Sequence, residues 1–237
     1  ARSGVLAGPF ADPSGAVEDA MSLRLNRSGI EELMDLVAGM IAPAALSDAA
    51  AGMNPVYEDS YGVWGWDAIV ISADVVGISF GTPQLSAEPG MGELTIEIAL
   101  PNLQVDLDAY GEAVGFDFDT TASLMAERAV VRGEIELGAD RGALAIELEN
   151  AEVELEGFSY DTSALPGDVE SWLFVDTIRA KIEEMVLAEI ETLVPALLDE
   201  TLSGLDPSFA VDLLGKELEV AAEFADAGID RDGVWMA

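Results

Sequence analysis

Carboxylates are the only abundant groups in this chain that could carry out chemistry. The 237 residues include 46 Asp and Glu but only 10 Lys and Arg, and they contain no His and no Cys. Without imidazole or thiol groups, the chain lacks the commonest general base, the commonest metal ligand and any cysteine nucleophile. It also lacks disulfides, so cysteine usage does not indicate a redox compartment. Acid/base hydrolysis by paired carboxyl groups stays open by residue type alone.

The spacing of the carboxylates is more typical of an exposed strand face than of a catalytic pair. Asp106 and Asp108 are two residues apart, as are Asp117 and Asp119, and this spacing places both side chains on one face of a strand. The Asp230-x-Asp232-Gly233 stretch resembles the start of a calcium loop, but no acidic residue follows at the closing position. We therefore predict a turn there, and we expect no metal, no cofactor and no enzymatic activity.

The charge balance limits the classes of partner. The net charge is −36, whereas half of the residues are hydrophobic and the mean hydropathy is +0.29, which favours a large core beneath an acidic surface. Nucleic acid is disfavoured because it requires a basic surface, and an anionic membrane is disfavoured for the same reason. No run of eighteen apolar residues occurs, so we expect no membrane-spanning helix. Acidity of this kind also serves solubility in salty or extracellular settings.

The elements that position these residues begin with a short strand and a helix. Residues 1–16 read as an irregular leader and residues 17–237 as one domain. Met21 to Asn26 alternate as a strand does, and Ser28 with Glu31 has the spacing of a capping box. The spacing of the apolar residues predicts a helix over 29–42, ended by Pro43 and an Ala/Gly stretch. Residues 54–65 read as a loop.

The pattern changes to β-structure from Trp66 to Tyr160. Apolar residues alternate in long runs, and the phase moves by one across Pro101-Asn102 and again near Asn150. A one-residue phase change is typical of a β-bulge, which bends and twists a strand. Met125, Ala129, Val131, Ile135 and Leu137 are predicted to face one side of a single strand. Several long strands with repeated phase changes favour a strongly curved antiparallel sheet.

A long helix follows the sheet. Apolar residues recur at three and four positions from Phe174 to Leu198, which predicts a helix over 168–205 that Pro195 kinks or interrupts. A helix of that length needs an equally long apolar partner, and the curved sheet is the only candidate. Residues 209–237 return to strand period, and they could lead into a further domain.

This order of elements resembles the tubular lipid-binding (TULIP) superfamily, in particular the N-terminal barrel of the bactericidal/permeability-increasing protein family. The matching stretches are MSLRLNRSGIEELMDLVAGMI at 21–41, GELTIEIALPNLQVDLDAYG at 92–111 and WLFVDTIRAKIEEMVLAEIETLVPALLDETLSGL at 172–205. The resemblance covers residues 17–235 and depends on pattern and order. It implies an α+β fold in which a long, strongly curved antiparallel sheet wraps around a long C-terminal helix and a shorter N-terminal helix.

The resemblance further implies an elongated apolar cavity that holds lipid tails. Carried over by position, its lining would be Ile30, Leu33, Met34, Val37, Met125, Val131, Ile135, Ile178, Ile182 and Met185. Methionine adapts well to flexible chains, and Met40 would add to the Met-rich lining. The alternative for each residue is an ordinary place in a closed core. The central expectation is that the apolar stripe of the long helix faces a hollow interior.

Two departures narrow what the resemblance implies about function. The bactericidal members carry a disulfide and a cationic tip, whereas this chain has no cysteine and is strongly acidic. The expectation is therefore a non-catalytic protein that binds or carries lipid or another apolar ligand, in a periplasm or outside the cell. Transient membrane contact, a homodimer or a further domain stay open as partners. The alternatives are a structural or protein-interaction module on the same scaffold, and a hydrolase built on acidic residues.

Overall fold

The computed structural model describes residues 23–63, 66–113, 116–140, 143–161, 171–203, 209–213, 216–220 and 226–236. The leader predicted at 1–16 lies outside these residues, so the division into leader and domain stays a prediction. The N-terminal elements are a short strand and two helices: β1 (Leu23–Leu25), α1 (Arg27–Met40) and α2 (Pro43–Met53). The main strands follow: β2 (Tyr57–Val63), β3 (Trp66–Ser79), β4 (Gln84–Pro89), β5 (Glu93–Ala113), β6 (Phe116–Asp140), β7 (Ala143–Glu156) and β8 (Ser159–Asp161). The chain then forms α3 (Ser171–Ser203), β9 (Phe209–Leu213), β10 (Lys216–Val220), β11 (Ala227–Asp230) and β12 (Gly233–Met236).

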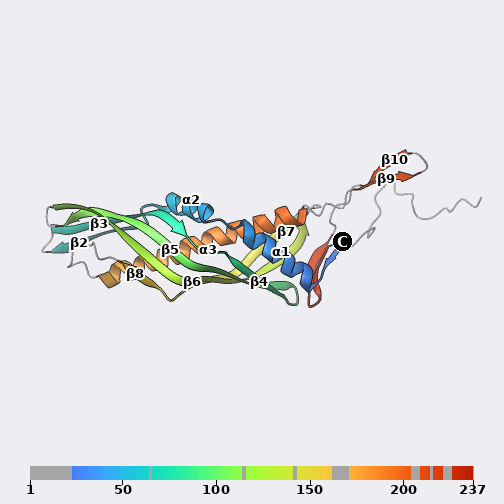
Figure 1. Cartoon of the computed structure of the whole chain (residues 1–237), viewed down its shortest axis with the longest axis horizontal. Helices are drawn as coiled ribbons and strands as arrows, with labels where there is room; N and C mark the ends of the chain where they lie inside the picture. The colour runs from blue at the N-terminus through green and yellow to red at the C-terminus, as the bar shows by residue number, and fades with distance from the viewer. Residues whose placement is uncertain are drawn as a thin grey trace, which may run out of the picture.

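A curled antiparallel sheet encloses the long helix, as the sequence predicts. The strand order is β2-β3-β5-β6-β7, with β4 paired to the first half of β5 and β8 paired to β6. Helix α3 packs against β7 on one side and against α2 and α1 on the other. Sheet and helix run together along the long axis of the molecule (Figure 1). The predicted α+β architecture is therefore confirmed.

Helix α1 begins two residues earlier than the sequence predicts. Asn26, not Ser28, is the N-cap, and its side-chain oxygen accepts a hydrogen bond from the Gly29 N–H at 3.0 Å. Asn26 is extended, with φ −75° and ψ 179°, so its side chain can reach the first turn of the helix. Asn and Ser are equally good caps, and sequence spacing alone does not distinguish them. The predicted start at residue 29 is therefore wrong.

Two elements are absent from the sequence prediction. Pro43 does not end the helical region but occupies the first turn of α2, where its missing N–H breaks no hydrogen bond. Leu46 and Ala50, one turn apart, are the buried residues of this helix. The predicted loop at 54–65 is likewise wrong for Tyr57–Val63, which pairs with β3 along its length. Its polar residues have low strand propensity, so pairing with the neighbouring strand decides its structure.

The two phase changes in the sheet have different causes. Near Asn150, with φ +51°, the β6–β7 register shifts between Arg132 and Glu134, so the predicted bulge is confirmed. At Pro101-Asn102 the β5–β6 register does not shift, because Leu100 pairs with Ala129 and Leu103 with Ala126. The bulge predicted there is wrong. Asn102 is left-handed at φ +53°, and both strands change faces at the same level without an inserted residue.

Helix α3 continues through Pro195 for 33 residues, which corresponds to roughly 50 Å at 1.5 Å per residue. The predicted interruption at Pro195 is therefore wrong. Proline removes only the hydrogen bond to the carbonyl of Glu191, and Glu191 is exposed, so water can satisfy that carbonyl. The helix keeps its apolar stripe against the sheet on both sides of the proline.

The two ends of the described chain meet in a small sheet of order β1-β12-β11. Asp230 and Gly233 pair across the β11–β12 hairpin, which confirms the turn predicted at 230–233. Strands β9 and β10 form a separate two-stranded sheet. Among the described helices, none alone has the length and apolarity to cross a membrane. The pair α1 and α2 reaches that apolarity only together, with a bend of 56° between them.

Candidate functional site

The candidate site is the apolar seam between α3 and the concave face of the sheet. Except for Tyr57, whose hydroxyl donates a hydrogen bond to Asp59, every buried side chain that the structure describes is apolar, and one continuous core joins α1, α2, α3 and the main sheet. The stripe of α3 that faces this core is fully buried along most of its length: Ile178, Ile182, Met185, Val186, Ile190, Val194, Leu198 and Leu202. The described stripe of α3 can therefore offer a ligand apolar contact and no side-chain hydrogen-bonding group.

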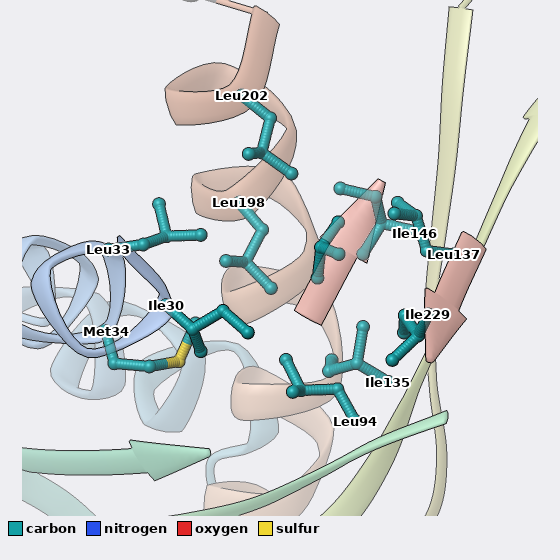
Figure 2. Close-up of a pocket in the computed structure, with 11 residues that line it drawn as sticks. Ile30, Leu33, Met34, Leu94, Ile135, Leu137, Ile146, Leu198, Leu202 and Ile229 are labelled. Atoms are coloured by element: carbon teal, nitrogen blue, oxygen red, sulfur yellow. The ribbon is translucent and has the colours of Figure 1, made fainter. Parts of the chain in front are cut away.

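A cavity of about 20 Å³ lies at one end of the seam. Its walls come from α1, the last turns of α3, the main sheet and the β11–β12 hairpin, and every lining side chain is apolar. Figure 2 shows these side chains converging beside α3. Leu33 of α1 and, on the other side of α3, Leu137 and Ile146 of the sheet are only half-buried, so the cavity approaches the surface at these residues (Figure 2). The complete lining is Ile30, Leu33, Met34, Leu94, Ile135, Leu137, Ile146, Leu198, Leu202, Ile229 and Val234.

A second cavity, of about 10 Å³, lies further along α3 at Ile182. Phe158 and Met125 form part of its wall. The Arg179 guanidinium stands 5.3 Å from the centroid of the Phe158 ring, and Arg179 also donates a hydrogen bond to Glu183 at 2.9 Å. The aromatic wall of this cavity is thus covered by a cation from the same helix that supplies Ile182.

Both cavities are far too small for a lipid tail. A single water needs about 10–15 Å³ by this measure, so each cavity is comparable to one water molecule. Among the described residues, neither cavity provides the hollow interior expected along the stripe of α3. The reason is geometric: the sheet curls closely around α3, so large side chains from both meet and fill the space between them.

The structure brings together only some of the predicted lining residues. Ile30, Leu33, Met34 and Ile135 line the first cavity, and Ile182 and Met125 line the second. The remaining predicted residues are buried in the core but line neither cavity: Val37, Val131, Ile178 and Met185. The assignment of these ten residues to ligand binding stays a prediction.

The sequence predicts that Met125 faces the interior together with Val131 and Ile135, and this prediction is wrong. Its side chain is 41% exposed, whereas its neighbours Leu124 and Ala126 are buried, because β6 changes faces between these residues and Ala129. Met40 is also exposed, at 38%. Of the four methionines predicted to line the interior, only Met34 and Met185 are buried.

Sequence reasoning did not place the C-terminal hairpin at the site. Ile229 and Val234 line the first cavity because β12 pairs with β1, which directly precedes α1. The apolar alternation of the hairpin marks a strand but contains no information about its partner. Other lining residues that were not predicted are Leu94, Leu137, Ile146, Leu198 and Leu202.

Polar interactions hold this hairpin at the edge of the site. Arg24 of β1 forms an ion pair with Asp230, and the Gly92 N–H donates to the Ile229 carbonyl at 3.1 Å. The backbone N–H of Asp232 and, next, the Arg24 guanidinium hold the pKa of Asp230 below its ordinary value. The hairpin wall of the cavity is therefore tied to β1 by backbone pairing and by Arg24, and to Gly92 by one backbone hydrogen bond.

The carboxylate pairs predicted for an exposed strand face lie as expected. Asp106 and Asp108 alternate with the buried residues Val105, Leu107 and Ala109, so both point away from the core. Asp106 accepts hydrogen bonds from Gln104 at 2.9 Å and Ser123 at 2.8 Å. Within the described ranges, no Asp or Glu is buried and no three acidic residues are grouped so as to hold a metal ion.

Comparison with known proteins finds similarity in structure only. No family model matches the sequence, and no curated protein matches it. A crystal structure of lipopolysaccharide binding protein matches with a TM-score of 0.61 and 11% identity, over 91% of this chain and 49% of that one. This chain thus spans about half the length of that protein. The solution structure of latherin matches with a TM-score of 0.38 and 12% identity, over 79% of this chain and 90% of that one. From the first of these matches, the chain has the same curled-sheet, long-helix fold as the matched half of lipopolysaccharide binding protein.

Proposed function

We propose that this chain binds and carries a lipid or another apolar ligand, without catalysis. The site is the end of the seam where α1, the last turns of α3 and the β11–β12 hairpin meet. The observation that carries the proposal is the first cavity, whose lining is wholly apolar and includes three half-buried side chains, Leu33, Leu137 and Ile146. The similar structure of a lipopolysaccharide binding protein supports the same class of ligand.

Binding requires this end of the molecule to open. A lipid tail does not fit a cavity of about 20 Å³, so α1 or the hairpin must move away from α3. A tail gains about 0.8 kcal/mol for each methylene that leaves water, so a chain of a dozen carbons offsets about 10 kcal/mol. That gain is large enough to compensate for separating a few apolar side chains and breaking the Gly92–Ile229 hydrogen bond.

The negative charge of the chain limits which lipid headgroups it can bind. With a net charge of −36, the molecule repels anionic headgroups, so lipopolysaccharide itself is a poor ligand for it. We propose a neutral amphiphile or a neutral apolar molecule. A carrier of this kind would work outside the cytoplasm, in a periplasm or an extracellular fluid.

Lipid extraction and native mass spectrometry of the purified protein test this proposal. The expected result is a protein that carries apolar molecules, or that takes up a neutral amphiphile when one is supplied. If the protein stays empty under both conditions, the proposal is wrong. A structural or interaction module on the same scaffold then becomes the better explanation, and self-association in light scattering would support it.

Variants in the wall of the first cavity provide a sharper test. We expect Ile146→Asp to lower the affinity for a neutral fluorescent fatty alcohol by about tenfold or more, because a carboxylate in an apolar wall costs more than about 1.4 kcal/mol. Val76→Asp is the matched control, since Val76 is 56% exposed on β3 and lines neither cavity. Equal affinity of the two variants would contradict this location for the site.

The opposite change should favour binding. Leu198→Ala enlarges the first cavity, and we expect it to increase uptake of the same alcohol while it lowers the free energy of unfolding by about 2–5 kcal/mol. Fluorescence titration and urea unfolding measure the two effects. A stability loss without any gain in uptake would show that the cavity is an ordinary packing defect.

A further inference from the structure

From Leu36 to the end of α2, the exposed residues are mostly apolar in a molecule that is otherwise strongly acidic. Between Leu36 and Tyr57 the sequence contains one charged residue, Asp48, although charged residues make up 24% of the whole chain. Leu36 is 55% exposed and Met40 is 38% exposed, one turn apart on α1. The exposed residues from Leu36 to the end of α2 at Met53, Asp48 excepted, form what we name the α1–α2 surface: Leu36, Gly39, Met40, Ala42, Pro43, Ala44, Ala51 and Gly52.

The α1–α2 surface continues into the candidate site. Leu33 precedes Leu36 by one helical turn, is half-buried, and forms part of the wall of the first cavity. Of the exposed acidic residues of α1, Glu31 and Asp35 lie away from the stripe that Leu33, Leu36 and Met40 form, whereas Glu32 lies one turn before Leu36 and borders it. An apolar path therefore leads along one flank of α1 from the surface to the cavity.

The shape and charge of this surface limit what can cover it. Gly39 and Gly52 face open space, and the remaining small residues leave Leu36 and Met40 as its two large side chains. The net charge of −36 opposes a second copy of this chain and an anionic bilayer. A surface of electrically neutral lipid provides apolar contact, no repulsion and no need for matched hydrogen bonds.

We propose that the α1–α2 surface docks onto the interface of a neutral membrane and delivers lipid past Leu33 to the first cavity. This proposal rests on the proposed function, because it explains how a ligand reaches that site. Helices α1 and α2 would lie in the headgroup region, with Leu36 and Met40 inserted as anchors. Asp48 opposes insertion and keeps the contact weak enough to be transient.

Flotation with vesicles of pure phosphatidylcholine tests the docking surface. The wild-type protein should float with the vesicles. The double variant L36E/M40E should bind them with an affinity at least about tenfold lower. The matched control is V70E/V76E on β3, because Val70 and Val76 are 38% and 56% exposed, close to the values of Met40 and Leu36. The control should bind as the wild type does.

Charge removal gives a second, independent readout. D48N should strengthen binding to the same vesicles, whereas E31Q, which removes an equal charge from the opposite side of α1, should not. Gly39→Trp should also strengthen binding, since a side chain at Gly39 meets open space and Trp favours the membrane interface. Gly138→Trp on β6, which also faces open space, serves as its control.

Several results would overturn the docking surface. One is that the wild-type protein does not bind phosphatidylcholine vesicles. Another is that L36E/M40E and V70E/V76E lose vesicle binding equally. A third is that light scattering detects a dimer that the substitutions L36E/M40E dissociate. Uptake of the soluble dye N-phenyl-1-naphthylamine without vesicles tests the proposed function separately. Dye uptake without vesicle binding would overturn only the docking surface. Vesicle binding without dye uptake would support the docking surface and contradict the proposed function.

Discussion

At the scale of single residues, Asp230 and Gly233 organise the hairpin that closes the candidate site. Asp230 accepts a hydrogen bond from the Asp232 N–H at 2.8 Å and pairs with Arg24 of β1. Gly233 has φ +144°, and a Cβ at this position would collide with the carbonyl oxygen of Leu25. The close approach of β12 to β1 therefore depends on a glycine.

The stability that Asp230 contributes should depend on pH. Its folded pKa is below the ordinary value of 3.8, so its contribution is fully present above that value and is lost as the pH falls through the folded pKa. We expect Asp230→Asn to lower the urea midpoint at pH 7 and to change it little at pH 2. Glu200→Gln, which removes an exposed charge from α3, is the control. An equal loss at both pH values would contradict the ionic contribution.

At the scale of elements, α3 determines the length of the seam. It supplies the buried stripe along the sheet and the wall residues Leu198 and Leu202 of the first cavity. Pro195 stands one turn before Leu198 and two turns before Leu202, and it removes a backbone hydrogen bond from the helix. The part of α3 that lines the site is therefore the part with the weakest local helix propensity.

We expect Pro195→Ala to stabilise this part of α3. The substitution restores the hydrogen bond to the Glu191 carbonyl, and it should raise the free energy of unfolding by about 1–3 kcal/mol. Urea unfolding measures the total effect, and amide hydrogen exchange locates it. Gly39→Ala on α1 calibrates the scale, with an expected gain of about 0.5–1 kcal/mol. No gain for Pro195→Ala would show that packing against the sheet requires the proline.

At the scale of the whole molecule, burial of the apolar core stabilises the fold, whereas repulsion between acidic groups on the outer surface destabilises it. On the outer face of the sheet, Glu136 stands directly opposite both Glu93 and Glu147 in neighbouring strands. Like charges in such positions are destabilising by about 0.2–1 kcal/mol each. In the next part of this face, Arg132 reduces the repulsion between carboxylates, because it forms ion pairs with Glu97 at 2.9 Å and with Glu154 at 3.4 Å.

Salt should therefore stabilise the protein. Raising the ionic strength from about 0.1 to 1 M shortens the Debye length from about 10 to 3 Å, which screens the repulsion between neighbouring carboxylates. We expect the urea midpoint to rise with KCl concentration. Glu136→Lys should raise the midpoint at low salt and reduce its dependence on KCl, because the lysine would stand between two glutamates. A midpoint that falls with KCl would contradict the role of charge repulsion.

The sequence by itself determined the types and order of the main elements. Alternation in β5 and β7 and the three-and-four spacing in α3 indicate which side of each segment is buried. That pattern is a local property of the chain, and it predicts a curved sheet around a long helix without knowledge of any partner. The turn at 230–233 and the bulge near Asn150 follow from local chemistry in the same way.

Only the tertiary structure decided the features that depend on partners. Strand β2 exists because β3 pairs with it, and Met125 is exposed because β5 and β6 change faces together. The filled interior is the clearest case. The volume of the space beside α3 depends on how side chains from the helices, the main sheet and the C-terminal hairpin pack together. A local sequence pattern therefore cannot predict it.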